Sequence, residues 1–167
     1  MAHSPGWAAE FRAEAQRLRA ALGDEVVAVH HVGSTAIPGI SAKPIIDILL
    51  AVREVERLDD LGPEMSGLGY EARGEFGIPG RRFFVKTTDG RRTHHIHAFA
   101  TGTPELERHL AFRDYMISHP ENARAYGRLK EGLAREFPTD IEAYMHGKDA
   151  FIKEMEREAL AWRRSRP

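Results

Sequence analysis

The fold is decided by residues 29–50, which read VHHVGSTAIPGISAKPIIDILL. Two apolar runs flank a Gly33-Ser34 turn. The first run, Val26–Val32, is short and β-branched, as in a strand; the glycine then frees the backbone and the serine can cap a helical turn. The second run, Ile45–Val52, predicts a central strand buried on both faces. The backbone N–H groups of such a turn favour an anion such as phosphate.

Asp47 is the only polar residue in the second run. An unpaired buried charge is costly, so a carboxylate at this place either becomes protonated or takes a partner. The partner could be a cation, which would make Asp47 the central acid of a site. The alternative is a structural carboxylate that accepts hydrogen bonds from loop N–H groups.

Composition excludes several classes of protein. The 167 residues, 42% hydrophobic and 29% charged, predict one domain over residues 1–167 with an ordinary core. The net charge of −1 argues against non-specific nucleic-acid binding, so any polyanion must bind locally. The chain has no cysteine, no apolar run of membrane-spanning length and no signal-like start. We therefore expect a cytoplasmic protein with no membrane partner.

The periodicity of the remaining sequence predicts further helices and strands. Apolar positions recur at helical spacing over residues 8–22, where Gly23 ends the helix. Further expected elements are a broken helix over 54–68, a short strand over 70–73, strands over 81–87 and 93–100, and helices over 104–119, 120–137 and 139–162. The expected fold is an α/β sheet with a helical C-terminal third.

The two later strands are joined by Thr88-Asp89-Gly90-Arg91, where Asp-Gly is a strong hairpin signal. Alternation along residues 93–100 puts His95, His97 and Phe99 on one face of the strand. A histidine pair at this spacing can chelate a metal, and imidazole suits zinc, iron, nickel or copper better than magnesium. The alternative is that the pair is simply the polar face of a hairpin.

Several longer segments together resemble the GrpB family, which belongs to the nucleotidyltransferase-fold superfamily. The resemblance covers nearly the whole chain and rests on His31-Val32-Gly33-Ser34-Thr35-Ala36-Ile37-Pro38-Gly39, Ala42-Lys43-Pro44-Ile45-Ile46-Asp47-Ile48-Leu49, Arg82-Phe83-Phe84, Thr93-His94-His95-Ile96-His97, Phe112-Arg113-Asp114-Tyr115 and Gly147-Lys148-Asp149-Ala150-Phe151-Ile152. It implies a nucleotidyltransferase-like fold, an α/β mixed sheet flanked by helices with a helical C-terminal third, and a site at the Gly-Ser turn.

The resemblance also implies where a divalent metal such as magnesium or manganese would bind. In the superfamily, the strand after the Gly-Ser turn carries two carboxylates at alternate positions, and a neighbouring strand adds a third; together they hold metal against a triphosphate. Here Gly33, Ser34 and Asp47 match this pattern, whereas the alternate position holds Leu49. The neighbouring hairpin strand offers histidines, so the expected metal ligands are Asp47, His95 and His97.

Basic residues near the turn could contact phosphate through charge-assisted hydrogen bonds. Lys43 precedes the Asp47 strand, Arg81 and Arg82 open the next long strand, and Lys148 lies in a family motif on the last helix. We expect Lys43, Arg82 and Lys148, with Gly33 and Ser34, to form the phosphate or nucleotide site. The alternative for each basic residue is a solvated charge or an ion pair.

The sequence thus predicts a domain that binds a nucleotide or another phosphorylated small molecule at the Gly-Ser turn, with metal-dependent nucleotidyl transfer as its expected activity and Asp47 as the catalytic acid. One alternative is a non-catalytic accessory domain, since GrpB-like domains also look fused to dephospho-coenzyme A kinases. Another is an enzyme that uses the histidines and Asp47 as a metal centre. The chain has no Gly-x-x-x-x-Gly-Lys-Ser/Thr segment, so it is not itself such a kinase.

Overall fold

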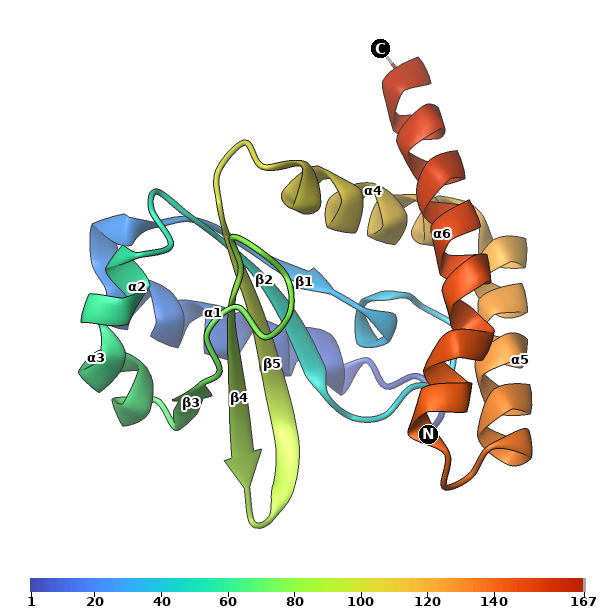
Figure 1. Cartoon of the computed structure of the whole chain (residues 1–167), viewed down its shortest axis with the longest axis horizontal. Helices are drawn as coiled ribbons and strands as arrows, with labels where there is room; N and C mark the ends of the chain where they lie inside the picture. Colours follow the sequence, from blue (N-terminus) through green and yellow to red (C-terminus); the bar gives the residue numbers. More distant parts are fainter. Residues whose placement is uncertain (167) are drawn as a thin grey trace.

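A computed structural model describes residues 1–166, which form a five-stranded sheet with helices on both sides (Figure 1). The elements follow in the order α1 (Gly6–Leu22), η1 (Gly23–Glu25), β1 (Val26–Val32), η2 (Ser34–Ala36), β2 (Ile46–Val52), α2 (Arg57–Asp60), α3 (Gly62–Gly67), β3 (Tyr70–Ala72), β4 (Arg82–Thr88), β5 (Arg91–Ala100), α4 (Pro104–Ser118), α5 (Pro120–Glu136) and α6 (Ile141–Ser165). The predicted α/β class and helical C-terminal third are confirmed.

The strands lie side by side in the order β1-β2-β5-β4-β3. All neighbours are antiparallel except β2 and β5, which run parallel in the centre of the sheet. The predicted hairpin joins β4 to β5, and both Asp89 and Gly90 have positive φ values, 53° and 77°, as a two-residue hairpin turn requires. The sequence therefore folds into a mixed sheet whose central parallel pair is β2 and β5.

Three apolar clusters hold these layers together. The largest lies between one face of the sheet and helices α1 and α3, and includes Leu18, Ile48 and Met65. A smaller cluster joins the other face to α4 through Leu49, Phe99 and Leu106. The C-terminal helices have their own cluster around Tyr115, Met116 and Ala159. Because β2 is covered on both faces, its side chains other than Asp47 are buried, as predicted.

Among the helices within residues 1–166, none combines the length and the apolar composition that a membrane crossing requires.

Candidate phosphate-binding site

Asp47 lies beside both predicted histidines. In the parallel pairing of β2 with β5, Asp47 is opposite His95 and Leu49 is opposite His97, so all four side chains share one face of the sheet. Asp47 Oδ1 is 3.6 Å from His95 Nδ1 and 3.4 Å from His97 Nε2. The structure thus places both imidazoles in contact distance of the carboxylate, as strand alternation indicates.

A buried arginine fixes the orientation of His97. Arg81 is 7% exposed, and its guanidinium donates to the carbonyls of Glu75 and Phe76. Its Nη1 lies 3.3 Å from His97 Nδ1. Because a guanidinium can only donate, Nδ1 is the acceptor and the hydrogen of the neutral ring is on Nε2, where it donates to Asp47. Arg81, considered above as a phosphate contact, is instead a positioning residue for His97.

The carboxylate of Asp47 is ionised. Burial by itself would raise the pKa of Asp47, but the hydrogen bonds from His95 and His97 outweigh it and lower the pKa to about 2. At neutral pH the site therefore contains a fixed negative charge.

The residues around Asp47 do not fit the two-magnesium centre that the superfamily implies. Its second carboxylate position holds Leu49, which is fully buried. His97 Nε2 carries a hydrogen and so has no lone pair free for a metal. Within residues 1–166 no three histidine, aspartate or glutamate side chains form a group that could hold a metal ion. Metal binding by Asp47, His95 and His97 stays a prediction, and we derive no reaction step from it.

The Gly33-Ser34 turn packs directly against the carboxylate. Gly33 has a φ of +74°, and a Cβ on it would lie 2.5 Å from Asp47 Oδ2, so only glycine fits. The turn continues as the short helix η2, where Thr35 Oγ1 lies 2.9 Å from His31 Nε2 and donates to the carbonyl of Ile45. These contacts fix the turn, so that Ser34 and Asp47 line the same pocket.

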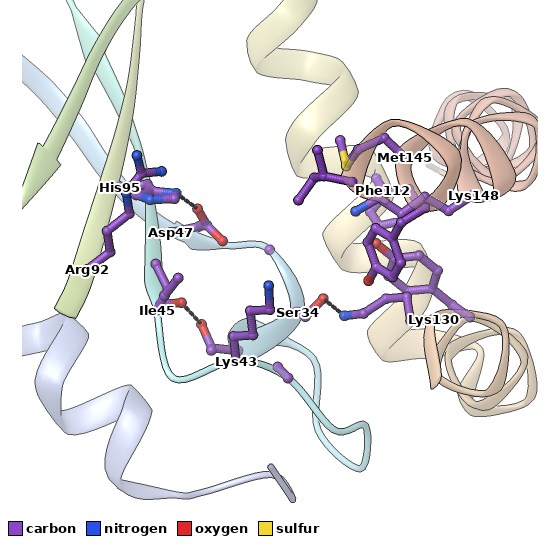
Figure 2. Close-up of a pocket in the computed structure, with 16 residues that line it drawn as sticks. Ser34, Lys43, Ile45, Asp47, Arg92, His95, Phe112, Lys130, Met145 and Lys148 are labelled. Atoms are coloured by element: carbon purple, nitrogen blue, oxygen red, sulfur yellow. Dashed lines mark hydrogen bonds and ion pairs between the residues drawn. The ribbon is translucent and has the colours of Figure 1, made fainter. Parts of the chain in front are cut away.

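A pocket of about 460 Å³ opens in front of this turn (Figure 2). One side is formed by the turn and the sheet, and the other by α4, α5 and α6. The residues lining it are Gly33, Ser34, Thr35, Ala42, Lys43, Ile45, Asp47, Arg92, His95, Phe112, Tyr126, Lys130, Ile141, Tyr144, Met145 and Lys148. Six of the predicted site residues therefore meet in one pocket, namely Gly33, Ser34, Lys43, Asp47, His95 and Lys148, and His97 lies just behind Asp47.

Three lysines from separate segments line the pocket that contains the Ser34 hydroxyl. Lys130 of α5 donates from Nζ to Ser34 Oγ over 2.5 Å, and Lys43 and Lys148 line the same pocket. Burial, reinforced by the charges of Lys148 and Lys43, lowers the pKa of Lys130 to about 8. Burial and then Lys43 also lower the pKa of Lys148. Repulsion between the lysine charges contributes to both shifts after burial, and an anion between the lysines would relieve that repulsion.

The prediction for Arg82 is wrong. Its guanidinium forms an ion pair with Asp59, with Nε 2.9 Å from Oδ1. Arg82 is opposite Ala98 on β5, and Ala98 belongs to the cluster beneath α1. Since side chains alternate between faces, Arg82 points away from the face that carries Asp47 and His97.

The sequence analysis missed Lys130 and the aromatic residues beside the lysines. Lys130 Nζ lies 5.0 Å from the ring centre of Tyr126, and Lys148 Nζ lies 5.1 Å from that of Tyr144. Both pairs have the spacing Tyr-x-x-x-Lys, which places the two side chains on one helix face. This repeated spacing, on consecutive helices, is the signal that could have identified the second wall of the pocket.

Known proteins of similar sequence cover almost all of this chain. A profile of the family described as "GrpB protein" matches residues 1–158. The UPF0157 protein YqkA of Bacillus subtilis is 46% identical over 160 residues, which are 96% of this chain but 46% of YqkA. The chain is also 27% identical to part of a dephospho-CoA kinase of Mycolicibacterium paratuberculosis, covering 95% of this chain and 45% of that protein. The chain thus spans about half the length of these two relatives.

Comparison with solved structures identifies the fold. The crystal structure of the conserved protein GrpB from Enterococcus faecalis superposes with a TM-score of 0.90 at 45% identity, covering 96% of both chains. The Cid1 poly(U) polymerase in its MgGTP-bound form gives a TM-score of 0.55 at 15% identity over 80% of this chain and 44% of Cid1, a likeness of fold alone. The chain therefore belongs to the GrpB family and has a nucleotidyltransferase-like fold.

Proposed function

We propose that the pocket binds the phosphate groups of a nucleotide or of another phosphorylated small molecule. The observation that carries this proposal is that Lys43, Arg92, Lys130 and Lys148 line one pocket together with Ser34, with Asp47 as the one carboxylate among the lining residues. Three of the five lysines of the chain line this single pocket, although the net charge of the chain is −1. Such a local cationic site favours a polyanionic ligand of small size.

The wall formed by α6 supports a ligand that also has an apolar or planar part. Ile141 and Met145 are 68% and 51% exposed and line the pocket beside the ring of Tyr144. Exposed apolar side chains next to a cluster of cations suit a molecule that joins a flat or apolar group to phosphate. A nucleotide has both parts.

Nucleotidyl transfer is the finer form of this proposal. It is supported by the shared fold with Cid1, whose structure holds MgGTP, and by the position of Asp47 after the Gly-Ser turn. The carboxylate would then act at the reacting phosphate while the lysines hold the others. Leu49 in place of the second acid is the observation against transfer, so binding is the function that the geometry supports best.

A non-catalytic accessory role is the second candidate. One observation favours it: a protein named dephospho-CoA kinase contains a segment similar to nearly this whole chain. A phosphate-binding pocket without a second acid fits a domain that holds a phosphorylated ligand beside another enzyme.

Thermal unfolding with ATP and with adenosine tests the binding proposal. Binding to the folded state adds about 2.7 kcal/mol to the free energy of unfolding when the ligand concentration is about 100 times the dissociation constant. We expect that gain with ATP but not with adenosine. The double variant Ser34→Ala, Lys43→Ala should lose most of it. Lys153→Ala is the matched control because Lys153 is exposed and pairs with Asp149 outside the pocket. Equal gains in the parent and the double variant would place the ligand elsewhere and overturn the proposal.

Pyrophosphate release separates transfer from an accessory role. The protein is incubated with each nucleoside triphosphate and magnesium or manganese, and the Asp47→Asn variant is treated in parallel. Release that depends on Asp47 supports nucleotidyl transfer. Binding of ATP without any release supports the accessory role.

A further inference from the structure

Lys130 differs from the other two lysines of the pocket in its contacts. Its Nζ donates to Ser34 Oγ, lies over the Tyr126 ring, and is the pocket lysine that reaches the Gly-Ser turn directly (Figure 2). The side chain therefore extends from α5 across the pocket toward Asp47. Its amine is held in one place, next to a hydroxyl and inside a cavity large enough for a small ligand.

Burial and the nearby lysine charges favour the neutral form of Lys130. Lys148 of α6 and Lys43 of the loop before β2 oppose its charge, whereas Asp47 of β2 and Glu131 of α5 support it. Burial is the largest influence, and together these groups lower the pKa of Lys130 to about 8. A larger share of this amine than of an ordinary lysine therefore has a lone pair at neutral pH.

The enrichment of lysine over arginine at this pocket fits a reactive amine. The chain has 24 lysine and arginine residues in all, of which five are lysines, and three of these line the pocket. Arginine binds phosphate well but stays protonated, whereas lysine changes its pKa readily when buried and can become a nucleophile.

We propose that Lys130 forms an imine with phosphorylated aldehydes that enter the pocket, so that this amine is a covalent attachment site. The lone pair of Nζ adds to the carbonyl carbon, and the nitrogen passes a proton to the carbonyl oxygen to give a carbinolamine. Loss of one water molecule then leaves the C=N bond. Ser34, hydrogen-bonded to Nζ, is placed to relay the proton, and Lys43 and Lys148 are placed to hold the phosphate.

This inference rests on the proposed phosphate binding for the ligand class but not for the reactivity of the amine. The ligand class is defined by its two parts, a phosphate for the lysine cluster and an aldehyde for the Lys130 amine. An aldehyde without phosphate lacks the first part. Comparing an aldehyde that has a phosphate with one that lacks it therefore separates the phosphate-binding claim from the claim that the Lys130 amine is reactive.

Reductive trapping tests the proposal in the intact chain. The protein is treated with substoichiometric pyridoxal phosphate, reduced with sodium borohydride, and mapped by peptide mass spectrometry. At pH 7 the fraction of neutral amine is roughly two hundred times larger for a pKa of about 8 than for an ordinary lysine. We expect Lys130 to be labelled at least about tenfold faster than exposed Lys153. The expected advantage in rate is smaller than the difference in neutral amine because the less basic amine is also a weaker nucleophile.

Two controls decide the outcome. Lys130→Arg keeps a cation but removes the nucleophile, so labelling at this position must disappear without transfer to Lys43 or Lys148. Pyridoxal without phosphate must label Lys130 at least several-fold more slowly.

Labelling spread over the surface lysines, or preferred at Lys43 or Lys148, overturns the proposal. Equal labelling by both aldehydes overturns the phosphorylated ligand class. If ATP fails to stabilise the chain while Lys130 is still labelled selectively, the phosphate-binding function fails separately from the reactive amine.

Discussion

Two carboxylates on opposite faces of the sheet have similar partners and different surroundings. Glu14 of α1 contacts Lys86 Nζ at 2.9 Å and His94 Nε2 at 3.3 Å. Asp47 contacts the next histidine of β5, His95, together with His97. Glu14 is 2% exposed, whereas the Asp47 side chain is 27% exposed.

The difference lies in what covers each group. Glu14 is sealed between α1 and the β4-β5 hairpin, so its ion pairs tie the helix to the sheet. Asp47 faces a pocket that three lysines line. A carboxylate held by basic side chains is thus structural where the protein closes over it, and available to a ligand where a cavity remains. The variants below are designed to separate these two roles.

The largest effect is expected at Glu14. In Glu14→Gln the ammonium of Lys86 loses its buried counter-charge, and removing one partner of a buried ion pair costs about 3–5 kcal/mol. Denaturant unfolding should show this loss, while ATP binding should be unchanged. Glu10→Gln, at an exposed position of the same helix, is the control. A loss below about 1 kcal/mol would contradict the structural role.

Gly33→Ala should damage stability and binding together. The positive φ alone costs about 1–3 kcal/mol for a residue with a side chain, and the new Cβ would also collide with Asp47 Oδ2. Gly39→Ala is the matched control, because Gly39 has a φ of +84° in the same loop but no atom within 4 Å of its Cβ position. We expect only Gly33→Ala to abolish the thermal shift with ATP. Equal behaviour of the two variants would mean that the contact with Asp47 has no role.

Asp47→Asn should lower the free energy of unfolding less than the two variants above, since the shape of the side chain is kept. The amide oxygen of asparagine can occupy the place of Oδ1 but has no negative charge and so binds both imidazoles more weakly, and we expect the free energy of unfolding to fall by about 1–3 kcal/mol with or without manganese. Denaturant titrations of both proteins, each with and without the metal, measure it. A difference that appears only with manganese would instead establish Asp47 as a metal ligand.

The smallest expected effect is a change of ATP affinity with pH. Below pH 8 Lys130 is protonated and attracts phosphate; above pH 8 the free protein loses this charge. The stabilisation by ATP should therefore weaken by up to about 1.4 kcal/mol per pH unit above 8. Without ATP the free energy of unfolding changes with pH in the opposite direction. Between pH 8 and about 10 this lysine binds a proton in the unfolded chain but not in the folded chain, so stability rises with pH there.

Lys130→Arg is the control for this pH effect, because a guanidinium stays charged over the whole range. Thermal unfolding from pH 7 to 9.5 measures both proteins. If the variant and the parent respond alike, the pH dependence comes from another group.

The sequence was sufficient for the parts of the site that lie close together in the chain. The Gly33-Ser34 turn and the strand of Asp47 follow from local residue preferences, and Asp89-Gly90 predicts the hairpin. Alternation along β5 then places His95 and His97 on one face. These features depend on φ preferences and side-chain periodicity, which act over a few residues.

The missed and wrong residues depend on contacts between distant segments. Lys130 enters the site only because α5 packs beside the Gly-Ser turn, and nothing near Lys130 in the sequence indicates that turn. Arg82 follows a family motif, but its face is set by pairing opposite Ala98. Its partner Asp59 lies 23 residues away in the chain. Such placements follow from tertiary packing rather than from local pattern.

The parallel pairing of β2 with β5 has a consequence for the order of folding. Asp47 and His97 are 50 residues apart in sequence, whereas β4 and β5 are joined by a two-residue turn. Closing a short loop costs little chain entropy, so the hairpin can form early, while the parallel contact must wait for the long segment between β2 and β5 to close. The histidines and the carboxylate thus meet in a late step, and amide hydrogens along the β2-β5 junction should gain protection from exchange after those of the hairpin.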